Sequence, residues 1–344
     1  MEGKRKIRIC INWAGACGGC DVAILDIEEK IFDIVEMADI VYWPVVMDFK
    51  REDLKAWGKN GIDIGIFNGV IRTSEQEEDA EILREKCKLL VSLGSCACFG
   101  GIPGLANTSD REGVFEVCYK ETPSTDNPQY VTPKTEFEMD GYKLELPEFY
   151  DTVKALHQVV DVDYYIPGCP PTREQIIDVV NIIKTFVETG ELPPKGTVIA
   201  SEKALCDECD RAKTRENKRI EKVYRPHQIV ADSEKCFLDQ GIICMGPATR
   251  GGCGQKCIKV NMPCRGCFGP TKAMLDPGAE AMSAIGSILG TGEDYVSVEK
   301  IVEMLKDLKD PLGTFYRFTL PVAIINRAVK DEKKDEKKGG YYGS

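Results

Sequence analysis

Cysteine is the residue type that most constrains this chain. Its 344 residues include 16 cysteines but only 2 histidines, His157 and His227. So few histidines count against Cys2His2 zinc fingers and against histidine-based acid–base chemistry. Residues 1–10 hold no apolar signal region and no cleavage site, which predicts a cytoplasmic protein. Thiols stay reduced in that compartment, so dense cysteines indicate metal ligands more often than disulfides.

The charge balance excludes one broad class of function. The chain carries 45 basic and 56 acidic side chains, a formal net charge of −11. Nucleic-acid binding needs a basic face, so no nucleic-acid partner is expected. The longest uncharged run, residues 89–109, is interrupted by several glycines and a proline, and no membrane span is expected.

Short apolar runs alternate with helical patterns in the first half of the chain. The predicted strands cover residues 6–12, 39–46, 63–70, 88–94 and 161–166. The predicted helices cover residues 21–37, 74–86 and 172–189. Near-continuous apolar strands that alternate with helices imply a parallel sheet covered on both faces. We therefore predict an α/β fold, a flavodoxin-like doubly wound domain over residues 3–190.

The remainder of the chain does not follow this pattern. Residues 104–147 are predicted to leave the sheet as an excursion that contains a hairpin. Residues 191–290 carry eight cysteines and many glycines with little periodicity, which predicts an irregular cysteine-rich domain built around an inorganic core. A C-terminal helical segment is expected over residues 291–328, and a solvated tail over residues 329–344.

Four cysteines of the first half lie where predicted strands end. Cys17 and Cys20 follow the first strand as C-G-G-C, and Cys96 and Cys169 each follow a later strand. The carboxyl ends of parallel strands share one edge of a sheet, where open α/β folds bind ligands. Four thiolates can therefore converge there, and they suit either a tetrahedral zinc or an iron–sulfur cube.

The spacing favours a cluster over zinc at this edge. Structural zinc usually takes local pairs, whereas Cys96 and Cys169 each come alone from glycine-rich turns. Cys98 is an alternative ligand, but Cys96 is preferred because it immediately follows the strand. Cys10 and Cys87 lie in apolar context and are expected to be buried small hydrophobes.

The second half holds a longer series of thiols that divides into two sets of four. The series is Cys206-x2-Cys209, Cys236-x7-Cys244, Cys253-x3-Cys257 and Cys264-x2-Cys267. A pair of zinc knuckles is the alternative interpretation. Three sets of four on one chain favour redox centres, because a row of them forms an electron path and a row of zincs has no such use.

Taken together, these motifs resemble the small, electron-transfer subunit of nickel–iron hydrogenases. The most similar type is the cytosolic, methyl-viologen-reducing one of methanogens and related archaea, which does not use the deazaflavin coenzyme. The resemblance covers about residues 6–290. It is carried by C-G-G-C (17–20), G-S-C-A-C-F-G-G (94–101), E-T-P-S-T-D-N-P (121–128), P-G-C-P-P (167–171), C-M-G-P-A-T-R-G-G-C (244–253) and P-C-R-G-C (263–267).

The resemblance implies three 4Fe–4S clusters and assigns their ligands. The proximal set is Cys17, Cys20, Cys96 and Cys169; the medial set is Cys253, Cys257, Cys264 and Cys267; the distal set is Cys206, Cys209, Cys236 and Cys244. Periplasmic relatives often have proline where Cys257 stands and hold a three-iron centre, so cysteine here implies a full cube. They also use histidine where Cys206 stands.

One position departs from the family pattern. The family commonly places Glu directly after the C-x2-C pair, and this chain has Asp21. An acidic side chain there offers a proton path at the boundary with the large subunit. A carboxylate in the first turn of a helix is the structural alternative.

The implied function is electron transfer within a hydrogenase. Electrons from dihydrogen oxidation at the nickel–iron large subunit are expected to pass through the three clusters and leave near Cys206 and Cys209. The implied acceptors are a small iron–sulfur protein and a heterodisulfide reductase complex, and no catalytic residue is expected on this chain. The alternatives are a pure electron relay whose large subunit lacks nickel, and a zinc-bound structural protein.

Overall fold

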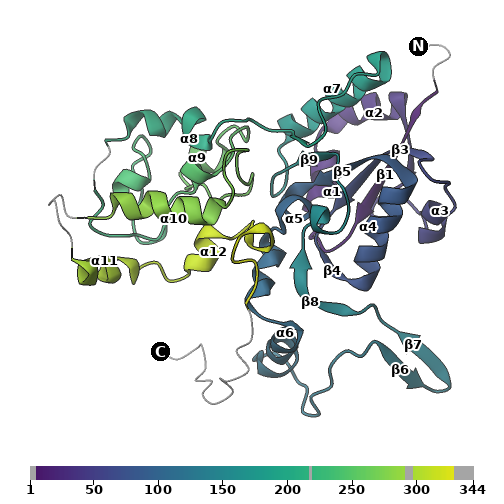
Figure 1. Cartoon of the computed structure of the whole chain (residues 1–344), viewed down its shortest axis with the longest axis horizontal. Coiled ribbons are helices and arrows are strands. Elements are labelled where there is room, and N and C mark those ends of the chain that lie inside the picture. The colour runs from purple at the N-terminus through teal and green to yellow at the C-terminus, as the bar shows by residue number, and fades with distance from the viewer. Residues whose placement is uncertain (1–4, 217–218, 291–296, 329–344) are drawn as a thin grey trace.

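A computed structural model describes residues 5–216, 219–290 and 297–328 of the chain (Figure 1). The tail predicted over residues 329–344 lies outside this description, as does the start of the predicted C-terminal segment. Two lobes are visible in Figure 1: one is built around a sheet, and the other contains short helices and long irregular connections. None of the helices in the described residues has the length and apolar character needed to cross a membrane.

The sheet of the first lobe has six parallel strands in the order β10-β9-β5-β3-β1-β2. They are β1 (Ile7–Trp13), β2 (Ala38–Tyr42), β3 (Ile62–Asn68), β5 (Cys87–Leu93), β9 (Tyr164–Ile166) and β10 (Thr197–Val198). Every residue of β3 is buried, as expected for a central strand covered on both faces. The α/β prediction is therefore confirmed. β10 lies beyond residue 190, and the domain boundary placed there stays a prediction.

Helices cover both faces of the sheet. On one face, α1 (Gly19–Leu25), α2 (Ile31–Met37) and α7 (Arg173–Thr189) pack together over an aliphatic core. The other face is covered by α3 (Arg51–Lys55) and α4 (Ser74–Lys86), which contact each other and bury a second core. Both cores are dominated by aliphatic side chains, so hydrophobic burial fixes the sheet between its helices.

The helix predicted over residues 21–37 is interrupted. Glu28 has a φ of 58°, a left-handed conformation that ends the first helical segment, and a 3-10 turn over Glu28–Lys30 precedes α2. Apolar residues keep helical spacing across the break, so the periodicity alone could not reveal it. The helix predicted over 172–189 is correct to within one residue, because Thr172 caps its start and Gly190 its end.

The excursion contains a hairpin, in agreement with the sequence pattern. Its strands are β6 (Glu136–Met139) and β7 (Tyr142–Glu145), and every residue in them is exposed. The hairpin projects away from the sheet lobe (Figure 1). The excursion also holds a 3-10 helix (Ile102–Thr108), α6 (Arg111–Glu116) and a π-helical turn (Val117–Glu121), and it returns through β8 (Phe149–Lys154), which pairs with β4 (Ile71–Thr73).

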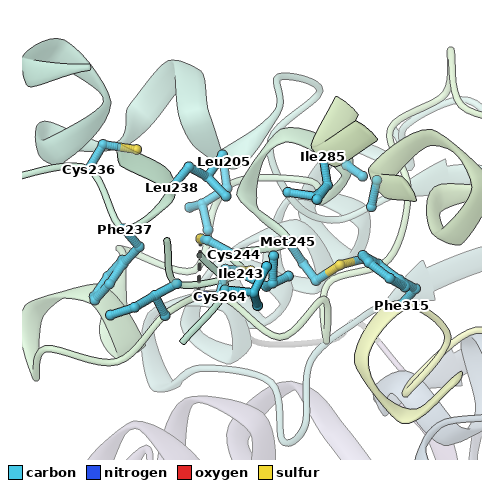
Figure 2. Close-up of a cluster of buried hydrophobic side chains, with 14 of the residues drawn as sticks. Leu205, Cys236, Phe237, Leu238, Ile243, Cys244, Met245, Cys264, Ile285 and Phe315 are labelled. Carbon is cyan, nitrogen blue, oxygen red and sulfur yellow. Dashed lines mark hydrogen bonds between the residues drawn. The ribbon is translucent and has the colours of Figure 1, made fainter. Parts of the chain in front are cut away.

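The second lobe is held together by a core that includes cysteines. Its helices are α8 (Leu205–Glu208), α9 (Lys256–Lys259), α10 (Pro277–Ile288), α11 (Val298–Leu305) and α12 (Pro311–Phe315). Cys236, Cys244 and Cys264 are buried among leucine, isoleucine and phenylalanine side chains (Figure 2). Apart from α10 the helices of this lobe are short, and the buried thiols fill part of the core between them.

Several contacts join the two lobes close to the carboxyl edge of the sheet. The backbone N–H of Gly101 donates to the carbonyl of Phe318 at 3.1 Å. Lys256 and Glu174 form an ion pair with an N–O distance of 2.9 Å. The hydroxyl of Ser95 donates to the carbonyl of Cys267 at 2.5 Å. The last contact ties the segment that carries Cys96 to the segment that carries Cys267.

Candidate functional site

The proximal set lies at the carboxyl edge of the sheet. Cys17 is in the loop after β1, Cys20 is in α1, Cys96 is in α5 (Gly94–Phe99), and Cys169 follows β9. The four thiols are close enough to influence one another electrostatically. Burial raises the pKa of the Cys96 thiol to about 12, and the neighbouring Cys169 and Cys17 contribute to the rise. Burial, then Cys96 and Cys169, likewise raises the pKa of Cys20.

These raised pKa values mean that the proximal thiols must lose their protons before they can act as ligands. Metal binding takes thiolates, and burial among other thiolates disfavours that charged form. A cationic iron core among the sulfurs reverses this preference, because a coordinated thiol is deprotonated outright. The donor set therefore fits a metal cluster chemically.

Glycines keep the space around the proximal thiols open. Gly94 has a φ of 80°, and a Cβ on it would collide with the sulfur of Cys20. A Cβ on Gly101 would lie 2.6 Å from the sulfur of Cys96. A side chain at either position would displace a thiol, so the backbone here can accommodate the sulfurs only if both residues are glycine.

Three further thiols of this lobe are tied into the sheet. Cys98 is fully buried, and its sulfur lies 3.3 Å from the hydroxyl and 3.4 Å from the carbonyl of Ser92. Burial raises its pKa to about 12. Cys98 is thus engaged with β5, which supports the preference for Cys96 as the ligand. Cys10 and Cys87 are also fully buried, as predicted, with their sulfurs 3.4 Å apart.

The distal set gathers around α8. Burial raises the pKa of Cys206 to about 12, and the neighbouring Cys244, Cys236 and Cys209 add to the effect in that order. A Cβ on Gly246 would lie 3.1 Å from the sulfur of Cys206 and 3.5 Å from that of Cys244. The structure therefore brings these four thiols together, with a glycine facing two of them.

The medial set is more open at one end than at the other. Cys257 in α9 is exposed and Cys253 is half-buried, whereas Cys264 is only 6% exposed. The pKa of Cys267 is raised to about 12 by burial, followed by Cys257, Cys253 and Cys169. Three of the predicted medial thiols are thus mutual neighbours. Burial, then Cys244 of the distal set, raises the pKa of the fourth, Cys264, and Cys267 adds a smaller effect.

Two cysteines of the medial set connect the three sets. Cys267 lies beside Cys169 of the proximal set, as their electrostatic effect shows. The backbone N–H of Cys264 donates to the sulfur of Cys244, a distal thiol, at 3.3 Å (Figure 2). The sets therefore follow one another in space as proximal, medial and distal, although along the chain the distal set precedes the medial one. Among the residues that the structure describes, no group of histidine, cysteine, aspartate or glutamate is arranged to hold a single metal ion.

Asp21 is buried directly beside Cys20. Only 2% of it is exposed, and its two carboxylate oxygens accept hydrogen bonds from the Trp43 indole at 2.9 Å and the Asn68 amide at 2.5 Å. Within the described residues, the amide oxygen of Asn68 and the amide nitrogen of Asn12 have no hydrogen-bond partner. No pattern in the sequence indicated these neighbours. The network supports the structural role of Asp21, and the proton path stays a prediction.

Comparison with known proteins identifies relatives along nearly the whole chain. Residues 17–183 match the family model described as NADH ubiquinone oxidoreductase, 20 kDa subunit. The iron–sulfur subunit of the F420-non-reducing hydrogenase of Archaeoglobus profundus is 43% identical over 94% of this chain and 99% of its own length. A subunit of the F420-non-reducing hydrogenase of Methanothermobacter thermautotrophicus is 39% identical over 96% of this chain and 99% of its own length.

A solved structure supports the fold alone. The recombinant NiFeSe hydrogenase of Desulfovibrio vulgaris Hildenborough matches 78% of this chain and 95% of its own chain, with a TM-score of 0.50 and 16% identity. At this level of identity the likeness concerns the path of the backbone and not the roles of individual residues.

Proposed function

The chain belongs to the family of F420-non-reducing hydrogenase iron–sulfur subunits, and from that premise we propose that it is the electron-transfer subunit of a cytoplasmic nickel–iron hydrogenase. The observation that carries the proposal is the continuous succession of three cysteine sets. Cys267 lies beside Cys169, and Cys264 contacts Cys244. Every set is thereby linked to the next, and the contact between Cys264 and Cys244 is buried.

Each set is proposed to hold one 4Fe–4S cluster, which supplies reversible one-electron transfer when bound. The chain's own residues supply the thiolates, the low-dielectric surroundings and the room for them. The core around the distal and medial sets is apolar, and the backbone N–H of Cys264 points at a sulfur. A protein tunes the reduction potential of such a centre through hydrogen bonds to its sulfurs and through burial.

The large subunit is proposed to cover the proximal end of this succession. Cys17 and Cys169 are exposed there. Apolar side chains of the same region are also exposed, namely Trp13 at 47%, Val22 at 55% and Leu25 at 42%. Exposed apolar surface of this kind marks protein interfaces. A partner that covers it would bring its own centre close to the proximal set.

The opposite end is proposed as the electron exit. Cys206 is half-buried and lies in the short helix α8, away from the sheet lobe (Figure 1). A small iron–sulfur acceptor protein and a heterodisulfide reductase complex are the proposed partners at this end. A cytoplasmic location is proposed with them, because cysteines that serve as iron–sulfur ligands have to stay reduced, as they do in that compartment.

The proposal is tested by purifying the chain anaerobically with the subunits that accompany it. We expect about twelve iron atoms per copy of this chain, since three cubes hold four irons each. Nickel in the complex and hydrogen-dependent reduction of a viologen dye are also expected. A colourless, zinc-containing protein would exclude the electron path. Iron without nickel would leave the alternative, a pure relay beside a large subunit that lacks the nickel site.

Cys257→Pro is expected to convert the medial centre to a three-iron form. Cys257 is the most exposed residue of its set, but its thiol is partly covered, and this partial burial, followed by the neighbouring Cys253, raises its pKa. Removing this one thiol should release one iron and leave the remaining three ligands in place. Electron paramagnetic resonance of the oxidised variant should show a new three-iron signal. Cys257→Ser is the matched variant that retains an oxygen ligand, and absence of a new signal in both would contradict the assignment.

A further inference from the structure

A cavity in the cysteine-rich lobe has no place in the function proposed above. Its volume is about 420 Å³, and its walls come from residues 223–227, Ile243, Met262, Arg265, residues 307–310, Thr314 and Arg317. That volume lies in the range of small-molecule sites. The cavity is adjacent to the cysteine sets without including them, since Ile243 directly precedes Cys244.

Three arginines of this cavity lie close together. Arg225 is exposed, while Arg265 and Arg317 are half-buried. All three guanidinium groups line this one cavity, although Arg225, Arg265 and Arg317 come from separate segments of the chain. Among the residues that the structure describes, no carboxylate forms an ion pair with any of the three. Arg317 uses its Nε to bond the carbonyl of Gly313 at 2.8 Å.

The acidic residues of the same wall do not neutralise this cluster. Asp310 accepts a hydrogen bond from the backbone N–H of Gly313 at 2.8 Å and caps α12. Lys309 adds a further positive charge, and Asp307 a negative one. Four basic and two acidic side chains leave the cavity with a local charge of about +2, whereas the whole chain carries −11. The positive charge is therefore a local property of this cavity.

Much of the remaining lining is apolar. The accessible part of this apolar lining comes from Tyr224, Met262 and Leu308, whereas Val223 and Ile243 behind it are buried in the core. Guanidinium groups offer planar forks that fit phosphate oxygens in pairs, and they are the preferred partners of phosphate. A site with several cationic forks and an apolar wall suits a ligand that has both an anionic and an apolar part.

We propose that this cavity binds a nucleotide-sized organic phosphate, with the phosphate held by Arg225, Arg265 and Arg317 and the organic part against Tyr224, Met262 and Leu308. The inference is independent of the proposed electron transfer, because it uses none of the cysteine ligands. Free phosphate would fill only a fraction of about 420 Å³. The cationic cluster alone would accept it, but it would leave the exposed side chain of Met262 uncovered.

ADP is the probe for the test, and 8-azido-ADP locates its binding. The anaerobically purified complex is irradiated with 8-azido-ADP, and labelled peptides are mapped. We expect label on the segments around Tyr224 or Met262, abolished by excess ADP but not by excess inorganic phosphate at equal concentration. Arg225→Gln and Arg317→Gln are each expected to weaken this labelling at least tenfold. Arg173→Gln, which changes an exposed arginine on the sheet lobe, should leave it unchanged.

Three results would overturn the proposal. These are no label on either segment, label that persists at the same ADP concentrations in both arginine variants, or protection by inorganic phosphate as strong as by ADP. If the two arginine variants lost binding to an acidic partner protein while excess ADP did not reduce labelling, the cavity would receive protein carboxylates and not an organic phosphate. Iron content and absorption spectra of each variant establish that the cysteine-rich lobe is intact, and Arg265 is left unchanged because it lies between two predicted ligands.

Discussion

Replacing Cys169 by alanine is expected to abolish hydrogen-driven dye reduction by the complex. Cys169 follows β9 at the carboxyl edge of the sheet, and it influences both Cys96 of its own set and Cys267 of the medial set. Its loss therefore removes a proposed ligand at the point where two sets meet. Activity should fall at least a hundredfold, on the order of 3 kcal/mol in the barrier, and iron should fall from about twelve to about eight atoms per chain.

Cys118→Ala is the matched control for this experiment. Cys118 is exposed, lies in the excursion and belongs to none of the three sets. The control should keep full iron content and full activity. If Cys169→Ala retained hydrogen-driven dye reduction at the level of Cys118→Ala, Cys169 would not be a proximal ligand. About eight irons per chain in Cys169→Ala would indicate loss of one cluster, whereas loss of all iron would indicate loss of the whole fold.

The sheet was predictable because its strands leave a strong local signal. β3 and β5 are near-continuous apolar runs, and capped helices such as α4 follow or precede them. The break between α1 and α2 was not predictable, because it depends on the left-handed conformation of Glu28. A single residue with an unusual φ leaves no trace in a hydrophobic pattern.

The grouping of the cysteines was predictable in part. Strand ends identify all four proximal cysteines, Cys96 included, as neighbours, since parallel strands bring their carboxyl ends to one edge. Contacts between the sets were not predictable, because Cys264 and Cys244 meet through an irregular chain path. The resemblance to hydrogenase small subunits carried the ligand assignment in that lobe.

The surroundings of Asp21 and the arginine cavity could not be predicted from the sequence either. Asn68 and Trp43 meet Asp21 only through the packing of β3 and of the loop after β2 against α1. Arg225 and Arg317 lie far apart in the sequence and share a cavity only in the folded lobe. Pairs of polar residues so distant in sequence have no periodic pattern by which to recognise them.

Gly94→Ala is expected to prevent assembly of the proximal centre although all four of its cysteines remain. The φ of Gly94 is 80°, and a Cβ there would collide with the sulfur of Cys20. The left-handed conformation alone costs an alanine roughly 1–2 kcal/mol. The collision adds a displacement of Cys20, which is only 9% exposed and has little room to move. We expect about eight irons per chain and loss of hydrogen-driven dye reduction.

Gly190→Ala separates backbone strain from the collision. Gly190 has a φ of 79° at the end of α7, and a Cβ on it would meet nothing within 4 Å. This variant carries the same left-handed backbone strain, so its melting temperature should fall while its iron content stays at about twelve atoms per chain. Equal iron content in Gly94→Ala and Gly190→Ala would refute the argument. It would mean that the sulfur of Cys20 can bind in a second position, and that the glycine at 94 is needed only for the turn.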